Sequence, residues 1–392
     1  MTFDATWLEA EGDRLLAFAR ASVHPDGGFA WLDEEGSPQL DRPAELWISC
    51  RMTHVFALAH LMGRRWAGEL VDHGVAALAG RLRDHEHGGW WAAVDADGPV
   101  TRAKTAYEHA FVLLAASSAA LAGRPGADEL LADARAVLEE RFWDDEAGMV
   151  VEEWDESWTV LDAYRGVNAN MHAVEALLAS GDVGRAERIL TRVVHGFART
   201  GDWRIPEHFD TSWTPLPDYH RDQPAHPFRP YGATVGHWFE WSRLTLSLRV
   251  ALGDAAPDWM LADARALFDA GVREGWAVDG AEGFVYTVDW SGAPVVRQRM
   301  HWVVCEALAA AATLHAVTGD EMYAVCHGHW WAYADRVLID HERGSWHHEL
   351  DPANRPAAGT WSGKPDVYHA FQATLAPRLP VWPPFARALA GG

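Results

Sequence analysis

The chain alternates between long segments with apolar residues at helical spacing and short segments of glycine and aromatic residues. Apolar residues every three or four positions indicate a helix with one buried face, whereas alternating apolar residues after a glycine turn indicate a short strand. The short segments are found at residues 27–33, 88–95, 147–154, 201–207, 282–289 and 344–351. Six such segments predict a divergent sixfold repeat.

Each short segment lies between two predicted helices. The preceding helices are expected at residues 6–23, 67–84, 127–142, 183–199, 257–274 and 320–338. The following helices are expected at residues 49–62, 104–121, 168–179, 233–252, 298–317 and 365–374. Six helical hairpins with short hairpin-like connections favour an all-α fold, an (α/α)6 barrel, and an open solenoid is the alternative.

The polarity of the two sets predicts which helices are buried. The preceding set carries a charged stripe, as outer helices do, and the following set is apolar after a polar and aromatic start, as inner helices are. One closed ring implies a single domain over residues 1–392. We expect the loop 206–230, rich in Pro and Gly, to cover a site, and the chain after Pro377 to be extended.

Composition excludes several function classes. The 392 residues carry a net charge of −23, which opposes binding to nucleic acid and anionic membranes. The N-terminus shows no signal-peptide pattern and no run of about 18 apolar residues occurs, so the cytoplasm is the expected location. Three scattered cysteines form neither a disulfide framework nor a zinc motif.

Tryptophan and histidine are unusually frequent, with 22 and 21 residues. Tryptophan fills cores, and it also stacks on the apolar faces of sugar rings while its polar edge forms a hydrogen bond. Much of this tryptophan is structural. The excess still favours a carbohydrate site over a nucleotide or lipid site.

One segment, residues 229–241, combines a cation, aromatic residues, His237 and Glu240. Pro230 and Gly232 precede a helix predicted to begin near Ala233. On that helix His237 and Glu240 are three positions apart and therefore share one face. A histidine beside a carboxylate can transfer protons near neutral pH.

Similar clusters occur at the start of every predicted inner helix. They are Arg51 and His54; Lys104, Tyr107 and His109; Asn168 and His172; His237 and Glu240; His301, Trp302 and Glu306; and Lys364, Tyr368 and His369. In a closed ring these helix starts meet at one mouth of the barrel. We therefore expect one shared pocket rather than six unrelated core positions.

Several chemistries could use such a pocket. A metal site is disfavoured because no HExxH motif occurs, and glycoside hydrolysis would have to use Glu240 and Glu306 as its two carboxylates. The sequence contains no GxSxG motif, so it gives no support for a nucleophilic serine. Histidines fit proton transfer at a carbon beside a carbonyl, such as C2 of an open-chain aldose, with donors such as Arg51 stabilising the enediolate oxygen.

Motifs at the six helix starts carry a family resemblance. They are Ser49-Cys-Arg51-Met-Thr-His54, Lys104-x-x-Tyr107, Asn168-x-Asn-Met-His172, Arg229 with Gly236-His237-x-x-Glu240-Trp241, Trp302-x-x-x-Glu306 and Lys364-Pro-Asp-x-Tyr368-His369. Over nearly its whole length the chain resembles the N-acylglucosamine 2-epimerase superfamily, whose members are (α/α)6 barrels. Each motif alone is weak, and together they are specific.

The resemblance implies a role for each matching residue. His369 matches the histidine that moves the proton at C2, His237 matches its partner for ring opening or proton return, and Glu240 would tune His237. The positions that hold sugar hydroxyls and polarise O1 or O2 are Arg51, Tyr107, Asn168, His172 and Arg229. Trp302 would stack on the sugar. We place His172 with the catalytic residues and Glu306 with those that bind substrate, and we expect no metal and no cofactor.

The motifs around His172 and His369 look more like the monosaccharide isomerase branch than the cellobiose branch. The expected reaction is the interconversion of mannose and fructose, with lyxose as a further substrate. Sulfoquinovose isomerisation, N-acylglucosamine or cellobiose 2-epimerisation, and an inactive sugar-binding barrel remain alternatives. The expected partner is a monosaccharide, not nucleic acid or a membrane, and the chain would act as a monomer or homodimer.

Overall fold

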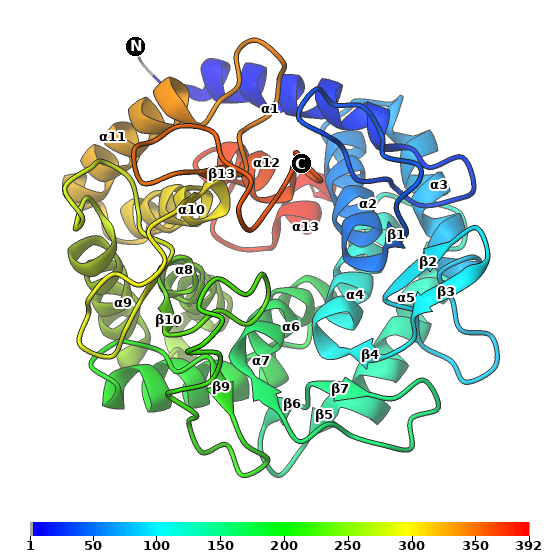
Figure 1. Cartoon of the computed structure of the whole chain (residues 1–392), viewed down its shortest axis with the longest axis horizontal. Coiled ribbons are helices and arrows are strands. Elements are labelled where there is room, and N and C mark those ends of the chain that lie inside the picture. Colours follow the sequence, from blue (N-terminus) through cyan, green and yellow to red (C-terminus); the bar gives the residue numbers. More distant parts are fainter. Residues whose placement is uncertain (1–2, 392) are drawn as a thin grey trace. The chain divides into compact units, whose positions relative to one another are not determined.

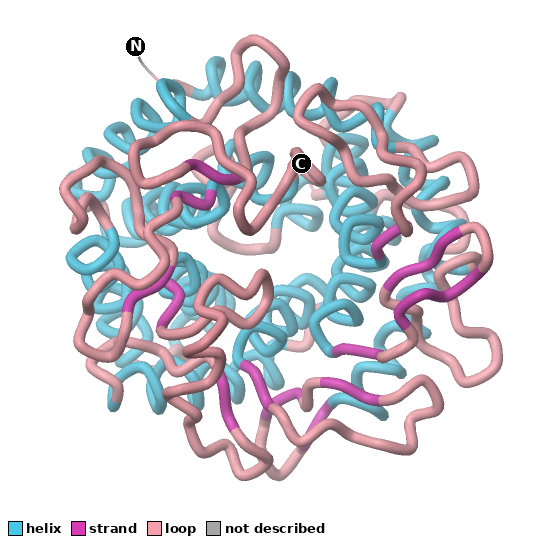
Figure 2. The backbone as a smooth tube through the Cα atoms, viewed as in Figure 1, coloured by secondary structure: helices cyan, strands magenta, loops and turns pink. Residues whose placement is uncertain are grey.

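The computed structural model describes residues 3–391, and most of them are helical (Figures 1 and 2). The chain forms two compact units. Unit 1 holds the chain up to Leu15 together with Leu190–Lys364 and His369–Trp382. Unit 2 holds Leu16–Ile189, Pro365–Tyr368 and the chain from Pro383. The single domain over residues 1–392 stays a prediction.

Unit 2 contains a row of three helices backed by a second layer. Its helices are α2 (Leu46–Leu61), α3 (Ala67–Ala79), α4 (Ala106–Leu121), α5 (Ala127–Val137) with a π turn at Leu138–Phe142, α6 (Val167–Ser180) and α13 (Phe385–Ala390). Helix α4 packs between α2 and α6, while α3 packs on α2 and α5 packs on α4 (Figure 1). Helix α13 packs against α2 and α4. The row α2–α4–α6 is almost entirely buried.

Unit 1 repeats this two-layer arrangement. Its helices are a π turn at Thr191–Ala198, α8 (Val235–Leu252) with a 3-10 turn at Gly253–Ala255, α9 (Trp259–Gly275), α10 (His301–Thr318) and α11 (Glu321–Val337). Helices α8 and α10 pack on each other, α9 packs on α8 and α11 packs on α10 (Figure 1). Three helices have residues in both units, namely α1 (Ala5–Ala19, followed by a 3-10 turn at Arg20–Ser22), α7 (Val183–Leu190) and α12 (Tyr368–Leu375).

The twelve helices predicted from hydrophobic spacing are all present, with ends shifted by a few residues. The expectation of an extended finish after Pro377 was wrong, because α13 forms near the end of the chain. Pro384 is its N-cap, where the missing N–H costs no helical hydrogen bond, and Ala386 is buried. No helix within residues 3–391 is long and apolar enough to cross a membrane.

The strands are only two to four residues long. They are β1 (Ala44–Glu45), β2 (Ala93–Asp95), β3 (Gly98–Thr101), β4 (Lys104–Thr105), β5 (Trp143–Asp144), β6 (Met149–Val150), β7 (Glu153–Trp154), β8 (Arg165–Gly166), β9 (His208–Phe209), β10 (Ala233–Thr234), β11 (Thr287–Val288), β12 (Arg299–Met300) and β13 (Glu349–Leu350). Antiparallel pairing joins β1–β2–β3, β4–β7 and β5–β6 in unit 2, and β10–β11 and β12–β13 in unit 1. Strands β1, β4, β10 and β12 run directly into α2, α4, α8 and α10, so each pairing fixes the start of a buried helix.

A recurring aspartate turn confirms the sixfold repeat. In each connection one Asp Oδ1 accepts backbone N–H bonds from residues two to five positions ahead, which is a side-chain-capped turn. The six are Asp33, Asp95, Asp155, Asp210, Asp289 and Asp351. These backbone bonds lower the pKa of Asp155, Asp210 and Asp351.

The chain has only two lysines, and both hold glycine turns. Lys104 Nζ lies 2.6 Å from Asp84 Oδ2 and 2.7 Å from the Gly88 carbonyl oxygen. Lys364 Nζ lies 2.7 Å from Asp340 Oδ2 and 2.9 Å from the Gly344 carbonyl oxygen. Both ammonium groups are fully buried. The sequence placed both lysines at a substrate pocket, whereas the structure gives them a structural role.

We expect Lys104→Met to lower the free energy of unfolding by about 3–5 kcal/mol, because it leaves the buried Asp84 carboxylate without its cation. The double variant Lys104→Met/Asp84→Asn removes both charges and should be more stable than the single variant. Urea unfolding followed by tryptophan fluorescence measures both. Arg355→Met, which removes an exposed ion pair with Asp351, is the control, with an expected change within about 1 kcal/mol. A similarly small change for Lys104→Met would contradict the role of the buried pair.

Candidate active site

His237 lies in the first turn of α8 and is paired with a carboxylate from another segment. Its Nδ1 is 2.9 Å from Glu207 Oε1 and 3.0 Å from Oε2. Glu207 also accepts the backbone N–H of Thr234, so one carboxylate fixes both the strand and the histidine that follows it. Both side chains are buried. Since a carboxylate accepts, Nδ1 carries the proton and Nε2 is the nitrogen that exchanges protons.

The sequence predicted Glu240 as the carboxylate that tunes His237. In the structure, Nδ1 of His237 is hydrogen-bonded to Glu207 instead. Glu240 is buried one turn further along α8, with Oε1 3.8 Å from a guanidinium nitrogen of Arg243. Helical spacing put His237 and Glu240 on one face, but it could not reveal a carboxylate 30 positions earlier. Glu207 is the last residue of the fourth glycine–aromatic segment, and this position was the only feature of the sequence that could have pointed to it as a site residue.

His369, at the start of α12, has an equivalent carboxylate. Its Nδ1 is 2.8 Å from Glu306 Oε1, and Arg243 Nε donates to Glu306 Oε2 at 3.2 Å. The four residues form a buried series, His369–Glu306–Arg243–Glu240. Glu306 was expected to bind substrate, and in the structure it bonds the ring of His369.

Trp302 links the two histidines within unit 1. Its ring centroid is 5.3 Å from that of His237 and 5.8 Å from that of His369. The ring sits against Gly236, where an added Cβ would collide with the indole. Gly236 therefore makes room for Trp302 directly beside His237. We call His237, Glu207, Trp302, His369 and Glu306 the histidine cluster.

Unit 2 holds a second group, centred on Arg51 of α2. Its guanidinium donates to Asp366 Oδ2 at 3.3 Å and to the Tyr107 hydroxyl at 3.1 Å. The same group lies over the rings of Trp47, Phe111 and Tyr368, at 4.9, 4.6 and 4.8 Å. Burial alone would lower the pKa of Arg51, but Tyr107 and Asp366 outweigh it and raise that pKa. We call Arg51, Tyr107 and Asp366 the arginine cluster.

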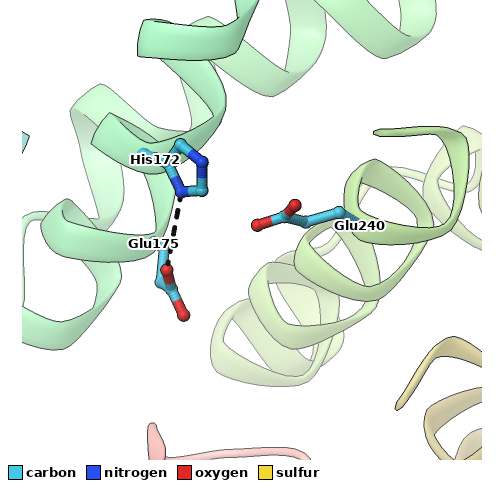
Figure 3. Close-up of side chains that lie close together, drawn as sticks. All are labelled: His172, Glu175 and Glu240. Carbon is cyan, nitrogen blue, oxygen red and sulfur yellow. Dashed lines mark ion pairs between the residues drawn. The ribbon is translucent and has the colours of Figure 1, made fainter. Parts of the chain in front are cut away.

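His172 and Glu175 lie one turn apart on α6, and Glu240 extends from α8 (Figure 3). His172 Nδ1 is 3.9 Å from Glu175 Oε2, and its ring meets the edge of Tyr107 at 5.1 Å. Glu175 also accepts a hydrogen bond from the Tyr368 hydroxyl. The structure thus brings Tyr107 and His172 together, as predicted, and adds Glu175 and Asp366, which the sequence did not single out.

Asn168 and Arg229 occupy less enclosed positions. Asn168 is half-buried at the start of α6, and its Oδ1 is buried with no hydrogen-bond partner among the described residues. An unpaired buried acceptor is costly unless a ligand supplies the donor. Arg229 is half-buried in the loop before β10, and its backbone is held by histidine side chains described below.

Two histidines of the expected pocket are structural instead. His109 uses both ring nitrogens, with Nδ1 2.7 Å from the Thr105 carbonyl oxygen and Nε2 3.2 Å from the Trp90 N–H. His54 Nδ1 bonds Ser118 Oγ at 2.7 Å. Burial lowers their pKa values to about 3 and about 4, so both stay neutral. The recurrence of histidine at helix starts therefore overstated the size of the site.

Paired buried helices, with histidines at the starts of α8 and α12 bonded to buried carboxylates, fit a helical-barrel enzyme, and solved structures support this class. A crystal structure of D-mannose isomerase matches with a TM-score of 0.90 and 28% identity, covering 96% of this chain and 98% of that chain. The cellobiose 2-epimerase of Spirochaeta thermophila matches with a TM-score of 0.83 and 21% identity, covering 99% and 96%. The fold is the (α/α)6 barrel.

Sequence comparison gives the family. The model of the N-acylglucosamine 2-epimerase family matches residues 27–373, and the chain belongs to this family. A D-mannose isomerase of Thermobifida fusca is 55% identical, covering 98% of this chain and 96% of that protein. The resemblance inferred from the helix-start motifs is thereby confirmed.

Proposed function

We propose that the protein is an aldose–ketose isomerase that interconverts D-mannose and D-fructose. The observation that carries the proposal is the histidine cluster, in which two imidazoles beside one indole are each bonded through Nδ1 to a buried carboxylate. The 55% identity to a protein named D-mannose isomerase supports the same substrate.

The reaction moves a hydrogen from C2 to C1 of an open-chain sugar. In the aldose the C1 carbonyl acidifies C2–H, so His369 takes that proton and leaves an enediolate. The O2 proton then passes to O1, and the proton taken from C2 is delivered to C1, which gives the ketose with a carbonyl at C2. The Glu306 carboxylate lies beside Nδ1 and stabilises the imidazolium that forms during transfer.

Ring opening needs a second proton carrier, because the anomeric hydroxyl loses a proton while the ring oxygen gains one. We assign this step to His237, whose Nδ1 is held by Glu207. Trp302 contacts both imidazole rings and offers an apolar face for the sugar. Glu240 supports the site through Arg243.

Hydroxyl recognition is assigned to polar groups at the other helix starts. Arg51 and Tyr107 present donors, Asn168 presents a buried acceptor without a partner, and His172 lies beside Tyr107. Arg229 provides a further cation. Such donors also stabilise negative charge on the enediolate oxygen.

The proposed chemistry consists of proton transfers, which imidazoles supply without a metal or cofactor. We further propose that the protein acts in the cytoplasm as a monomer or homodimer, and that D-lyxose is a second substrate. Glycoside hydrolysis is not supported by the histidine cluster, because Glu207 and Glu306 are each bonded to a histidine rather than placed as a free acid–base pair.

Incubation with mannose, fructose, lyxose and glucose in D₂O, followed by NMR, tests the proposal. We expect mannose and fructose to interconvert, with deuterium entering C1 of fructose, at an unchanged rate after exhaustive chelation. Conversion of mannose to glucose with label at C2 would identify an epimerase. Binding without conversion or label would identify a sugar-binding barrel and overturn the proposal.

A further inference from the structure

Four aromatic rings form a column in unit 1, one from His208 in β9 and three from the loop between β9 and β10. The rings of His208 and Tyr219 are 4.6 Å apart, those of Tyr219 and His220 are 4.3 Å apart, and those of His220 and His226 are 4.6 Å apart. Successive planes are tilted by 34°, 36° and 32°. This histidine column orders a segment that has no regular secondary structure.

The three histidines of the column bond the backbone on both sides of Arg229. His226 Nδ1 lies 3.1 Å from the Arg229 N–H nitrogen and 3.3 Å from that of Phe228. His220 Nδ1 donates to the Arg229 carbonyl oxygen at 2.7 Å, and His208 Nε2 donates to the Pro230 carbonyl oxygen at 2.8 Å. The conformation of the Arg229 backbone therefore depends on histidine side chains.

These bonds require a particular state of His226. Because two N–H groups point at Nδ1, that nitrogen must accept and cannot carry a proton. The ring is therefore neutral, with its proton on Nε2. An asparagine at this position would present Oδ1 at the same place along the side chain, and asparagine oxygens accept such N–H bonds in turns.

The surroundings of His226 oppose its protonation. Burial is the main cause that lowers its pKa, followed by the neighbouring His220 and Arg229, which are the titratable and charged groups that face it. Further along the column, burial lowers the pKa of His208 to about 4, with Glu207 beside it acting in the opposite direction. His208, at one end of the column, thus stays neutral at pH values where a solvated histidine, with a pKa near 6.5, gains a proton.

The pH dependence has a definite sign. A group whose pKa is lower in the ordered loop than in the released loop stabilises the ordered loop fully above the released value, about 6.5. That stability falls as the pH drops below 6.5 towards the lowered value. The loop between β9 and β10 also contacts the loop that precedes α12 in unit 1, where the Phe228 and Trp361 rings meet edge-on with their centroids 5.4 Å apart.

We propose that His226 is a positioning residue that holds Arg229 in its substrate-binding conformation only while its ring is neutral. The inference rests on the proposed function through the role of Arg229. The histidine cluster is the same in every variant at His226, so comparing the variants at one pH isolates the effect of this residue on substrate binding.

The test compares the wild type with His226→Asn, which keeps the acceptor and removes the titration, and with His226→Leu, which removes both. We expect the wild type and His226→Asn to have similar KM for mannose at pH 7.5. At pH 5.5 the wild-type KM should exceed that of His226→Asn by up to about tenfold, while kcat stays similar. His226→Leu should have a raised KM at both pH values. His85→Asn, at an exposed position outside the column, should follow the wild type.

Hydrogen exchange of residues 218–232 without substrate gives a second readout that needs no activity. After correction for intrinsic exchange rates, the wild type should lose protection between pH 7.5 and 5.5, and His226→Asn should retain it. If His226→Asn loses protection and affinity in parallel with the wild type, the inference is wrong. If no variant isomerises mannose but exchange behaves as expected, the proposed function fails and the histidine column stands.

Discussion

Replacing His369 by asparagine is expected to lower kcat for mannose by roughly 10²–10⁴-fold, or about 3–5 kcal/mol of transition-state stabilisation. The amide cannot take the C2 proton, although it can still bond Glu306 from a similar position. Because the change is at the reacting group rather than at a remote contact, KM should change much less than kcat. Steady-state isomerisation measures the overall reaction, and deuterium exchange at C2 measures removal of the C2 proton.

A second histidine variant separates chemistry from packing. His54 is equally buried on α2 and bonds Ser118, but it is neutral and belongs to neither the histidine cluster nor the arginine cluster. His54→Asn should lower stability and change kcat less than tenfold. Comparable kcat losses in His369→Asn and His54→Asn, or near-normal exchange at C2 in His369→Asn, would show that His369 is not the base.

The helices and the repeat could be predicted from the sequence because both depend on local periodicity. Apolar spacing located the twelve helices, and the glycine–aromatic segments located six connections between them. The aspartate turns in those connections became apparent only in the structure. Helix α13 was missed because a six-residue helix after two prolines has too few apolar positions to show a period. The lysines were misjudged because a helix-start position shows where a side chain begins, not whether it turns back to bind Asp84 or Asp340.

The partners of the site histidines could not be predicted, because they lie far away in the sequence. Glu306 is 63 positions before His369, and Glu207 is separated from His237 by a long loop without regular helix or strand structure. Only Glu240 and Glu175, three positions after His237 and His172, had the helical spacing that sequence reasoning can recognise. The histidine column was equally hidden, since His208, His220 and His226 show no regular period and form a group only through the fold of the loop.

Replacing His237 by asparagine is expected to lower kcat by roughly 10²–10⁴-fold as well, since ring opening or proton return then lacks its carrier. Glu207→Gln keeps the size of its side chain but removes the charge that stabilises a protonated His237, so we expect a loss of about 10²-fold. Measuring kcat separately on the cyclic aldose and on the ketose shows which direction depends more on ring opening. Circular dichroism and thermal melting verify that each variant is folded.

A double-mutant cycle then decides which carboxylate acts through His237. Residues that act as one unit have non-additive effects. The double variant His237→Asn/Glu207→Gln should therefore be little worse than His237→Asn alone, because Glu207 bonds that ring directly. With Glu240→Gln in place of Glu207→Gln the effects should come closer to additive, since Glu240 is linked through Arg243 and Glu306 to His369. The reverse pattern would restore Glu240 as the partner that helical spacing suggested.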